Sequence, residues 1–175
     1  MLPQNLVLRT GSTNLTNVSK IVTTPILLTG TAASTAILQT IPITLNNINS
    51  SVLLTGTITF TIQDTVADNT IGPLSLQILR SVNGVNTIIY RSDFLYELIP
   101  YLTNLNMSYQ FGFQWIDNPS SSLCPDPCLN STDTCVNSPI NYTFQIATLG
   151  LPNTTQSAGL VAQDYYSLTL VEISK

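Results

Sequence analysis

The chain has 175 residues, of which only 8% are charged, and its formal net charge is −4. Such a chain lacks the basic surface that would neutralise phosphates or dock on anionic lipid, so we expect no nucleic-acid partner. Thr, Asn and Pro interrupt every apolar stretch before the ~20 residues that a membrane-spanning helix needs, so we expect no membrane span. The abundance of Thr, Ile and Val predicts an all-β chain, because β-branched residues fit a pleated strand.

The sequence contains no histidine. This excludes Ser-His-Asp and Cys-His nucleophilic sites and ordinary His-containing zinc sites. Two carboxylate pairs that are near in sequence, Asp64 with Asp68 and Asp93 with Glu97, are the residue type that a glycosidase uses. We interpret them as solvated turn charges. The chain is therefore predicted not to be an enzyme and to bind no cofactor or metal.

Residues 1–18 are predicted to form an extended N-terminal arm. The arm lacks the basic start and apolar run of a signal peptide, so no secretory signal is expected in the sequence as given. Leu6, Val7 and Leu8 are predicted to form a donor strand that adds to the sheet of a neighbouring subunit, because a polar stretch follows them. The alternative is that this strand belongs to the sandwich of its own chain.

Residues 19–175 are predicted to form one domain, an all-β jelly-roll sandwich of about 8–10 antiparallel strands, because short alternating runs and turn signals follow one another regularly. The expected strands are 20–30, 35–45, 51–63, 74–82, 86–92, 107–117, 140–149 and 165–174. Pro25 and Pro42 cannot donate to a ladder, so their strands are expected at sheet edges or bulges. Residues 93–105 break the alternation and predict a short helix or an irregular crossover.

Residues 51–64 alternate almost without fault. Leu54, Gly56, Ile58, Phe60 and Ile62 share one side of the extended chain, and Thr55, Thr57, Thr59 and Thr61 share the other. A solvent face normally carries charges that keep sheets from associating, and this face carries none. We therefore predict that the four threonines form a lateral contact face. The alternative is that they reflect selection for β-propensity or acid tolerance.

Two further features lie between residues 82 and 117. Asn83-Gly84 separates two alternating runs and predicts a tight hairpin turn, because both residues tolerate positive φ. The run that follows places Tyr109, Phe111, Phe113 and Trp115 on one face. Aromatic residues at this period are predicted to fill the core, and a sugar-stacking surface is the alternative.

A loop at 118–139, rich in Pro, Ser, Asn and Cys, is long for a compact domain. Its three cysteines, Cys124, Cys128 and Cys135, are disulfide candidates, and their spacing is not that of a zinc knuckle. One thiol would remain for pairing with another subunit. The alternative is three reduced thiols, as expected in a cytosol. Seven Asn-x-Ser/Thr sequons, at Asn14, Asn17, Asn49, Asn106, Asn130, Asn141 and Asn153, are interpreted as compositional.

The chain resembles the small jelly-roll proteins of Bacillus-group spore surfaces in several stretches. These are LLTGTITFTI, LSLQILR with IIYR, YQFGFQWID, NYTFQIATL and the terminal YYSLTLVEIS. Those proteins are related in fold to tumour necrosis factor and form heads on collagen-like filaments or subunits of endospore appendages. The resemblance implies a trimeric ten-strand jelly roll that is made without a secretory signal and assembled on the spore. The chain has no Gly-x-y repeat, so we expect a shaft or anchoring subunit.

These features predict a non-enzymatic structural subunit that assembles with copies of itself, as a trimer or a head-to-tail filament. The product would be an extracellular fibre or surface layer, most simply a spore appendage, held by strand exchange and disulfides. Other spore-surface proteins are candidate additional partners. Two alternatives remain open: a trimeric head that binds carbohydrate or a host surface, and an archaeal filament or viral capsid or fibre protein.

Overall fold

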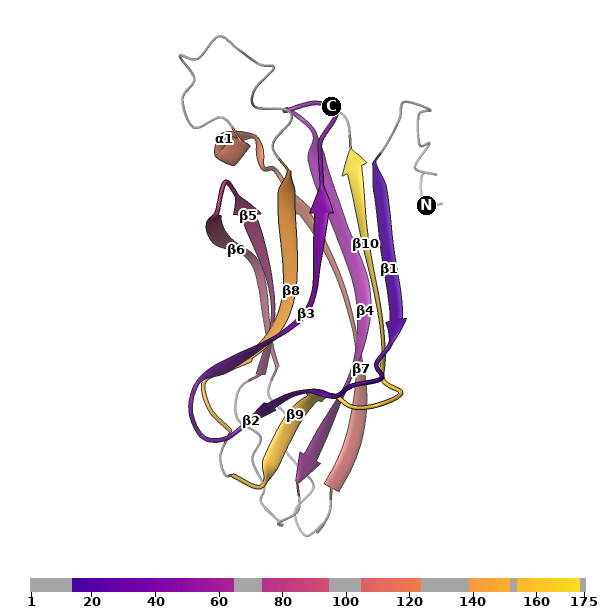
Figure 1. Cartoon of the computed structure of the whole chain (residues 1–175), viewed down its shortest axis with the longest axis vertical. Coiled ribbons are helices and arrows are strands. Elements are labelled where there is room, and N and C mark those ends of the chain that lie inside the picture. Colours follow the sequence, from indigo (N-terminus) through magenta and orange to yellow (C-terminus); the bar gives the residue numbers. More distant parts are fainter. Residues whose placement is uncertain (1–13, 65–73, 95–104, 124–138, 152–153, 174–175) are drawn as a thin grey trace, which may run out of the picture.

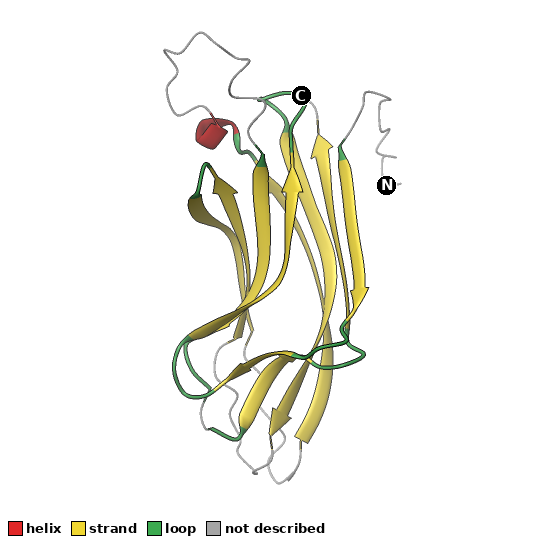
Figure 2. Cartoon of the chain, in the orientation of Figure 1, coloured by secondary structure: helices red, strands yellow, loops and turns green. Residues whose placement is uncertain are grey.

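The computed structural model describes residues 14–64, 74–94, 105–123, 139–151 and 154–173, and within these ranges it contains ten strands and one single-turn helix (Figures 1 and 2). The elements are β1 (Leu15–Ile21), β2 (Ile26–Thr29), β3 (Ser34–Ile43), β4 (Ser51–Asp64), β5 (Leu74–Val82), β6 (Val85–Phe94), β7 (Leu105–Asp117), α1 (Ser120–Leu123), β8 (Ile140–Thr148), β9 (Gln156–Leu160) and β10 (Tyr165–Ile173). The all-β prediction is confirmed.

The strands form two sheets that pack face to face. Sheet A has the order β1-β10-β4-β9-β2, with β7 paired to the other side of β4, and sheet B has the order β3-β8-β5-β6. All pairings are antiparallel. The core orders β1-β10-β4-β7 and β3-β8-β5-β6 are those of a jelly roll, in which two four-stranded antiparallel sheets pack together. The predicted jelly-roll sandwich is confirmed.

The structure refines the predicted strand limits at both ends of the domain. β1 begins at Leu15, inside the segment predicted as an arm, and pairs with β10 along its whole length. The predicted strand 20–30 is interrupted after Ile21 and resumes at Ile26. β9 was not predicted, because its sequence QSAGL is short and its small residues give no clear alternation.

The turn and proline predictions can be compared directly with the backbone. Asn83 and Gly84 have φ values of 50° and 80° and join β5 to β6, as the hairpin prediction requires. Pro42 lies in β3, which is an edge strand of sheet B with a register shift between Ile37 and Gln39, so this prediction is confirmed. Pro25 lies in the break between β1 and β2.

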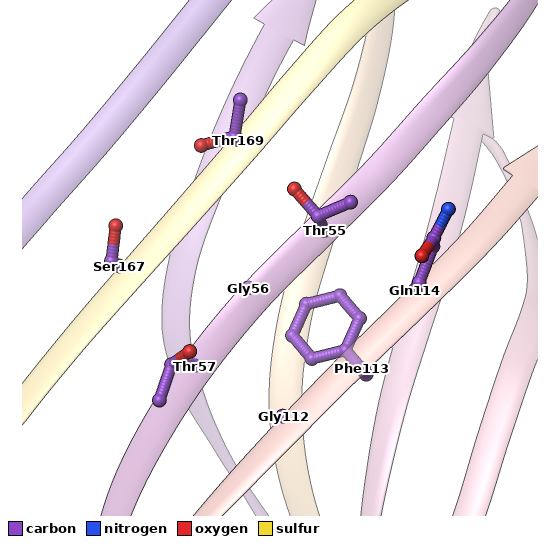
Figure 3. A pocket seen from close by; sticks show the side chains of 8 residues that line it. All are labelled: Thr55, Gly56, Thr57, Gly112, Phe113, Gln114, Ser167 and Thr169. Carbon is purple, nitrogen blue, oxygen red and sulfur yellow. The ribbon is translucent and has the colours of Figure 1, made fainter. Parts of the chain in front are cut away.

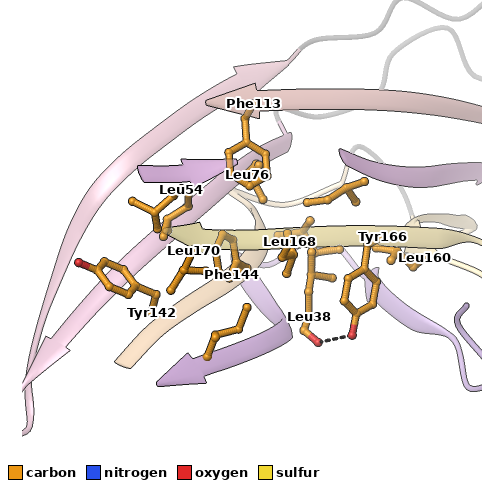
Figure 4. Packing of buried hydrophobic residues seen from close by; sticks show 14 of the residues in the cluster. Leu38, Leu54, Leu76, Phe113, Tyr142, Phe144, Leu160, Tyr166, Leu168 and Leu170 are labelled. Atoms are coloured by element: carbon orange, nitrogen blue, oxygen red, sulfur yellow. Dashed lines mark hydrogen bonds between the residues drawn. The ribbon is translucent and has the colours of Figure 1, made fainter. Parts of the chain in front are cut away.

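The core lies between the sheets and is made from the inward residues of alternating strands. Leu54, Leu168 and Leu170 of sheet A pack towards Phe144 and Leu76 of sheet B, and all five side chains are buried (Figure 4). The inward positions of β4 are those that the alternation predicted. Burial of this apolar surface is the main source of stability, at roughly 25 cal/mol per Å².

One buried polar cluster joins the two sheets at the end of β7. Arg80 Nη1 of β5 donates to Asp117 Oδ1 at 2.7 Å, and Tyr142 Oη of β8 donates to Asp117 Oδ2 at 2.7 Å. The Asp117 residue is only 6% exposed. Both carboxylate oxygens are thus engaged, which offsets the cost of burying the charge.

Three other carboxylates are buried against neutral hydrogen-bond donors. Glu172 accepts hydrogen bonds from the backbone N–H and side-chain amide of Asn46, and from the side-chain amide of Asn14. Asp164 accepts from the Thr61 hydroxyl and from the backbone N–H of Val161. Asp64 at the end of β4 is held in the same way by Thr155 and Gln156. These buried acidic side chains therefore hold neighbouring segments of the fold together through hydrogen bonds.

The Tyr142 hydroxyl should make the stability of the fold decrease at alkaline pH. Burial, and then the neighbouring Asp117 charge, raises its pKa well above the usual value. Because the unfolded chain loses this proton near pH ~10 while the folded chain keeps it, the contribution is complete below that pH and is lost as pH rises above it. We predict that in Tyr142→Phe the free energy of unfolding falls less steeply as pH rises above ~10. The same substitution should lower the free energy of unfolding by about 1–3 kcal/mol at neutral pH, because Asp117 loses a hydrogen-bond donor.

Urea unfolding between pH 7 and pH ~11 measures this effect. Tyr165→Phe is the control, because hydrogen bonds from Ser167 and Ser19 lower the pKa of the exposed Tyr165 side chain. In this control the free energy of unfolding should fall with rising pH at least as steeply as in the unchanged chain. An unchanged slope in Tyr142→Phe would contradict the prediction.

Candidate functional site

Thr55 and Thr57 of β4 lie at the centre of the outer face of sheet A (Figure 3). Thr57 faces Ser167 of β10 on one side and Gly112 of β7 on the other. Thr55 occupies the next outward row, between Thr169 and Gln114. The outward positions of β1, β10, β4 and β7 thus form one continuous surface, which we call the outer face.

The threonine row is shorter than the sequence predicted. Thr55, Thr57 and Thr59 are partly exposed. Thr61 has 0% exposure, because its hydroxyl lies between Ser108 at 2.7 Å and the carboxylate of Asp164. The prediction that Thr61 belongs to a contact face is therefore wrong. The sequence could not reveal this, because the covering residues lie far along the chain.

A shallow depression of about 520 Å³ lies in the middle of the outer face. Thr55, Thr57, Gln114, Ser167 and Thr169 contribute its polar lining side chains, the Phe113 ring contributes an apolar one, and two glycines contribute backbone (Figure 3). Hydroxyl and amide groups around it can donate or accept hydrogen bonds. The depression is therefore suited to polar, uncharged contacts.

The outer face carries no charged side chain among the described residues. Its accessible positions are Leu15, Asn17, Ser19 and Ile21 of β1, Tyr165, Ser167, Thr169, Val171 and Ile173 of β10, Leu53, Thr55, Thr57, Thr59 and Gln63 of β4, and residues 106–116 at even numbers in β7. Large apolar side chains flank the polar centre, with Ile21 67% exposed at one end and Leu15 and Ile116 64% and 50% exposed at the other. Apolar residues bordering an uncharged polar centre are compatible with docking a protein surface.

The two glycines of the depression have different roles. A Cβ at Gly56 would lie 2.7 Å from the Phe113 ring and 2.7 Å from the backbone oxygen of Ser167. Phe113 thus occupies the space beside Gly56 and reaches Phe144 of sheet B, with ring centroids 5.8 Å apart. A Cβ at Gly112 would meet nothing closer than 3.9 Å. Gly56 is therefore required by packing, whereas Gly112 is open to substitution.

The predicted aromatic face of β7 is mostly core. Phe113 is buried, and Tyr109 and Phe111 are partly buried against the core cluster, so the core interpretation holds for these three residues. Trp115 differs, because its side chain is 42% exposed beside Tyr90, with ring centroids 5.7 Å apart. The alternation alone could not predict this, since Trp115 lies where the edges of the two sheets open to solvent.

Several other predicted residues have a defined place. Asp64 is buried, and Asp93 forms an exposed ion pair with Arg91 at 2.7 Å. Their suggested partners Asp68 and Glu97 lie outside the described residues, as do the donor-strand candidates Leu6, Val7 and Leu8 and the cysteines Cys124, Cys128 and Cys135. Within the described ranges no group of three His, Cys, Asp or Glu side chains could hold a metal ion. No helix in the part of the chain that the structure describes is long and apolar enough to cross a membrane.

No family model matches the chain, and no curated protein matches it. Among solved structures, it is similar to the structure of infectious bursal disease virus, Gx strain, with a TM-score of 0.46 and 13% identity over 91% of this chain and 35% of that chain. A subviral particle of the VP2 protein of this virus has a TM-score of 0.41 and 12% identity, over 91% of this chain and 32% of that chain. The structure of T=1 particles derived from infectious bursal virus has a TM-score of 0.41 and 11% identity, over 92% of this chain and 35% of that chain.

The chain spans about a third of the length of these structures. Similarity of this degree carries no functional argument. The assignment of the jelly roll therefore rests on the observed strand order, and the assignment of the outer face rests on its residues.

The glycine pair gives a direct test of the site's packing. We predict that Gly56→Ala destabilises the fold by about 1–3 kcal/mol, because its methyl group would clash with the Phe113 ring and a β10 carbonyl. Gly112→Ala is the matched control and should change stability by less than about 1 kcal/mol. Chemical unfolding of both variants measures the difference, and equal losses would contradict the assigned contacts.

Proposed function

We propose that this chain is a non-enzymatic structural subunit that associates with copies of itself through the outer face of sheet A. The observation that carries the proposal is the absence of charge from the described part of this face. Of the charged residues in the described ranges, only Lys20, Arg91 and Asp93 are exposed, and none lies on the outer face. A sheet face without charge lacks the usual protection against association.

The finer proposal is an extracellular assembly on a bacterial spore, in the form of an appendage or surface layer. The sequence resemblance to spore-surface jelly-roll proteins supports this location. Strand exchange by Leu6, Val7 and Leu8 would link subunits head to tail, and Cys124, Cys128 and Cys135 would lock them covalently. A head-to-tail contact does not close and therefore generates a filament.

The outer face can be tested by introducing like charges at its centre. We predict that Thr57→Glu with Ser167→Glu weakens self-association at least tenfold, because like charges in a contact cost several kcal/mol. Thr35→Glu, an exposed threonine of β3 in sheet B, is the matched control and should associate normally. Light scattering after size-exclusion chromatography measures the oligomer, and negative-stain microscopy distinguishes filaments from closed shells. Normal assembly of the double variant would refute the outer face as a contact.

The arm and the cysteines require separate experiments. Deletion of residues 1–12 should convert filaments into discrete soluble oligomers if the arm links subunits. If disulfides only reinforce contacts that already hold the subunits together, reductant should weaken the filaments without dissociating them into subunits. Filaments that persist after the deletion would rule out donor-strand exchange while leaving the outer-face contact in place.

A further inference from the structure

We propose that the edge strand β7 pairs with β7 of a second copy, antiparallel and around a twofold axis at Gly112, so that sheet A continues across two chains. This inference rests on the proposed self-association and names a second contact for it, which runs along the edge of β7 and not through the plane of the outer face. The contact is isologous, since the same residues contribute from both copies.

β7 differs from the other sheet edges. It pairs with β4 and with no other described strand, so it ends sheet A on that side. Its 13 residues contain no proline, and the run from 105 to 116 contains no charge. By contrast, β1 carries Lys20, β3 carries Pro42 and a register shift, and β6 carries the Arg91–Asp93 ion pair. The remaining edge strand, β2, is only four residues long. Charges, prolines, bulges and short length are features that protect sheet edges from pairing, and the run from 105 to 116 has none of them.

The sequence of β7 is nearly the same when read from either end. Residues 109–115 are YQFGFQW, with Gly112 at the centre, and this order mirrors itself except that Tyr109 exchanges with Trp115. In an antiparallel pair around a twofold axis, each residue faces its mirror position in the second strand. Gly112 would then face Gly112 of the second copy, and Gln110 would face Gln114. The strand is therefore complementary to itself.

Each mirrored pair makes a favourable contact. Gln110, Gly112 and Gln114 are exposed on the outer face, where two glutamine amides facing each other can exchange hydrogen bonds. On the other side of the strand, Trp115 faces Tyr109 of the second copy, and aromatic cross-strand pairs stabilise sheets. The 42% exposed Trp115 side chain would be covered by this contact.

A second copy is the occupant that the observations favour over a strand from another protein. Mirror symmetry in β7 gives no advantage to a foreign strand, whereas in self-pairing it places like residues opposite each other. Self-pairing also brings no two like charges together, because this run has none. The hydrogen bonds of the shared ladder supply the affinity, as in other complexes formed by strand addition.

Cross-linking tests the axis. In a chain carrying Cys124→Ser, Cys128→Ser and Cys135→Ser, Gly112→Cys should form a disulfide-linked dimer under mild oxidation, because directly opposed residues lie within disulfide range. There is room for the new side chain, since a Cβ at Gly112 meets nothing closer than 3.9 Å. Gln114→Cys in the same background is the matched control. It should stay monomeric on a denaturing gel, because its own mirror position lies four residues away along the pair.

Charge exchange in the otherwise unchanged chain provides an independent test. Gln110→Lys with Gln114→Lys places like charges opposite each other and should raise the dimer dissociation constant at least about tenfold. Gln110→Lys with Gln114→Glu places opposite charges at the same positions and should restore dimerisation in a salt-sensitive way. Trp115 is the only tryptophan, so its emission should shift to longer wavelength as the dimer dissociates on dilution.

The outcomes separate this inference from the proposed function. Failure of Gly112→Cys to cross-link, together with equal dimerisation of the two charge variants, would overturn β7 pairing even if filaments still form. Cross-linking at Gly112 that survives Thr57→Glu with Ser167→Glu would establish edge pairing independently of the outer face. Equal cross-linking by Gln114→Cys would place the axis elsewhere and overturn the proposed register.

Discussion

The two-sided pairing of β4 is the constraint on which the rest of the molecule depends. β4 hydrogen-bonds to β10 and β9 on one side and to β7 on the other, so both its edges are covered. Its inward side chains, including Leu54, Ile58 and Ile62, build the core against sheet B. Because the side-chain period of a strand is two, the same backbone fixes the threonines on the outer face. A shift by one residue would exchange core and surface, so the core holds the outer face in place.

The distribution of charge follows from the same architecture. Asp64, Asp117, Asp164 and Glu172 are buried in described parts of the chain, and each is held by hydrogen bonds at a loop or a strand end. These carboxylates tie segments together that are distant in sequence, as Glu172 does between β10 and the β3–β4 connection. A buried charge that loses its partner is costly, so these sites disfavour alternative arrangements. The acidic residues thereby fix the fold while the outer face of sheet A remains neutral.

The sequence predicted what depends on local alternation and little of what depends on distant contacts. Most of the strands, the Asn83-Gly84 turn, the edge position of Pro42 and the inward face of β4 followed from period-two patterning and turn chemistry. The burial of Thr61 did not, because it depends on Asp164, more than a hundred residues away in the chain. The exposure of Trp115 was also not predicted, since a sequence pattern shows which side of a strand a residue faces and not where a sheet ends. The mirror symmetry of β7 was visible in the sequence, but only the observed edge position gives it a structural consequence.

The outer face and the β7 edge point in different directions, and this determines what they could build together. A twofold contact closes on itself, so β7 pairing alone would produce dimers. In such a dimer the two outer faces would join into one wider sheet surface, and the depression beside Gly112 would meet its copy at the axis. A second contact through that surface would then extend the assembly, unless the symmetry axes meet so as to close a ring or shell. Whether the product is a fibre or a closed particle therefore depends on the angle between two contacts on one rigid sheet, and not on any chemistry at a single site.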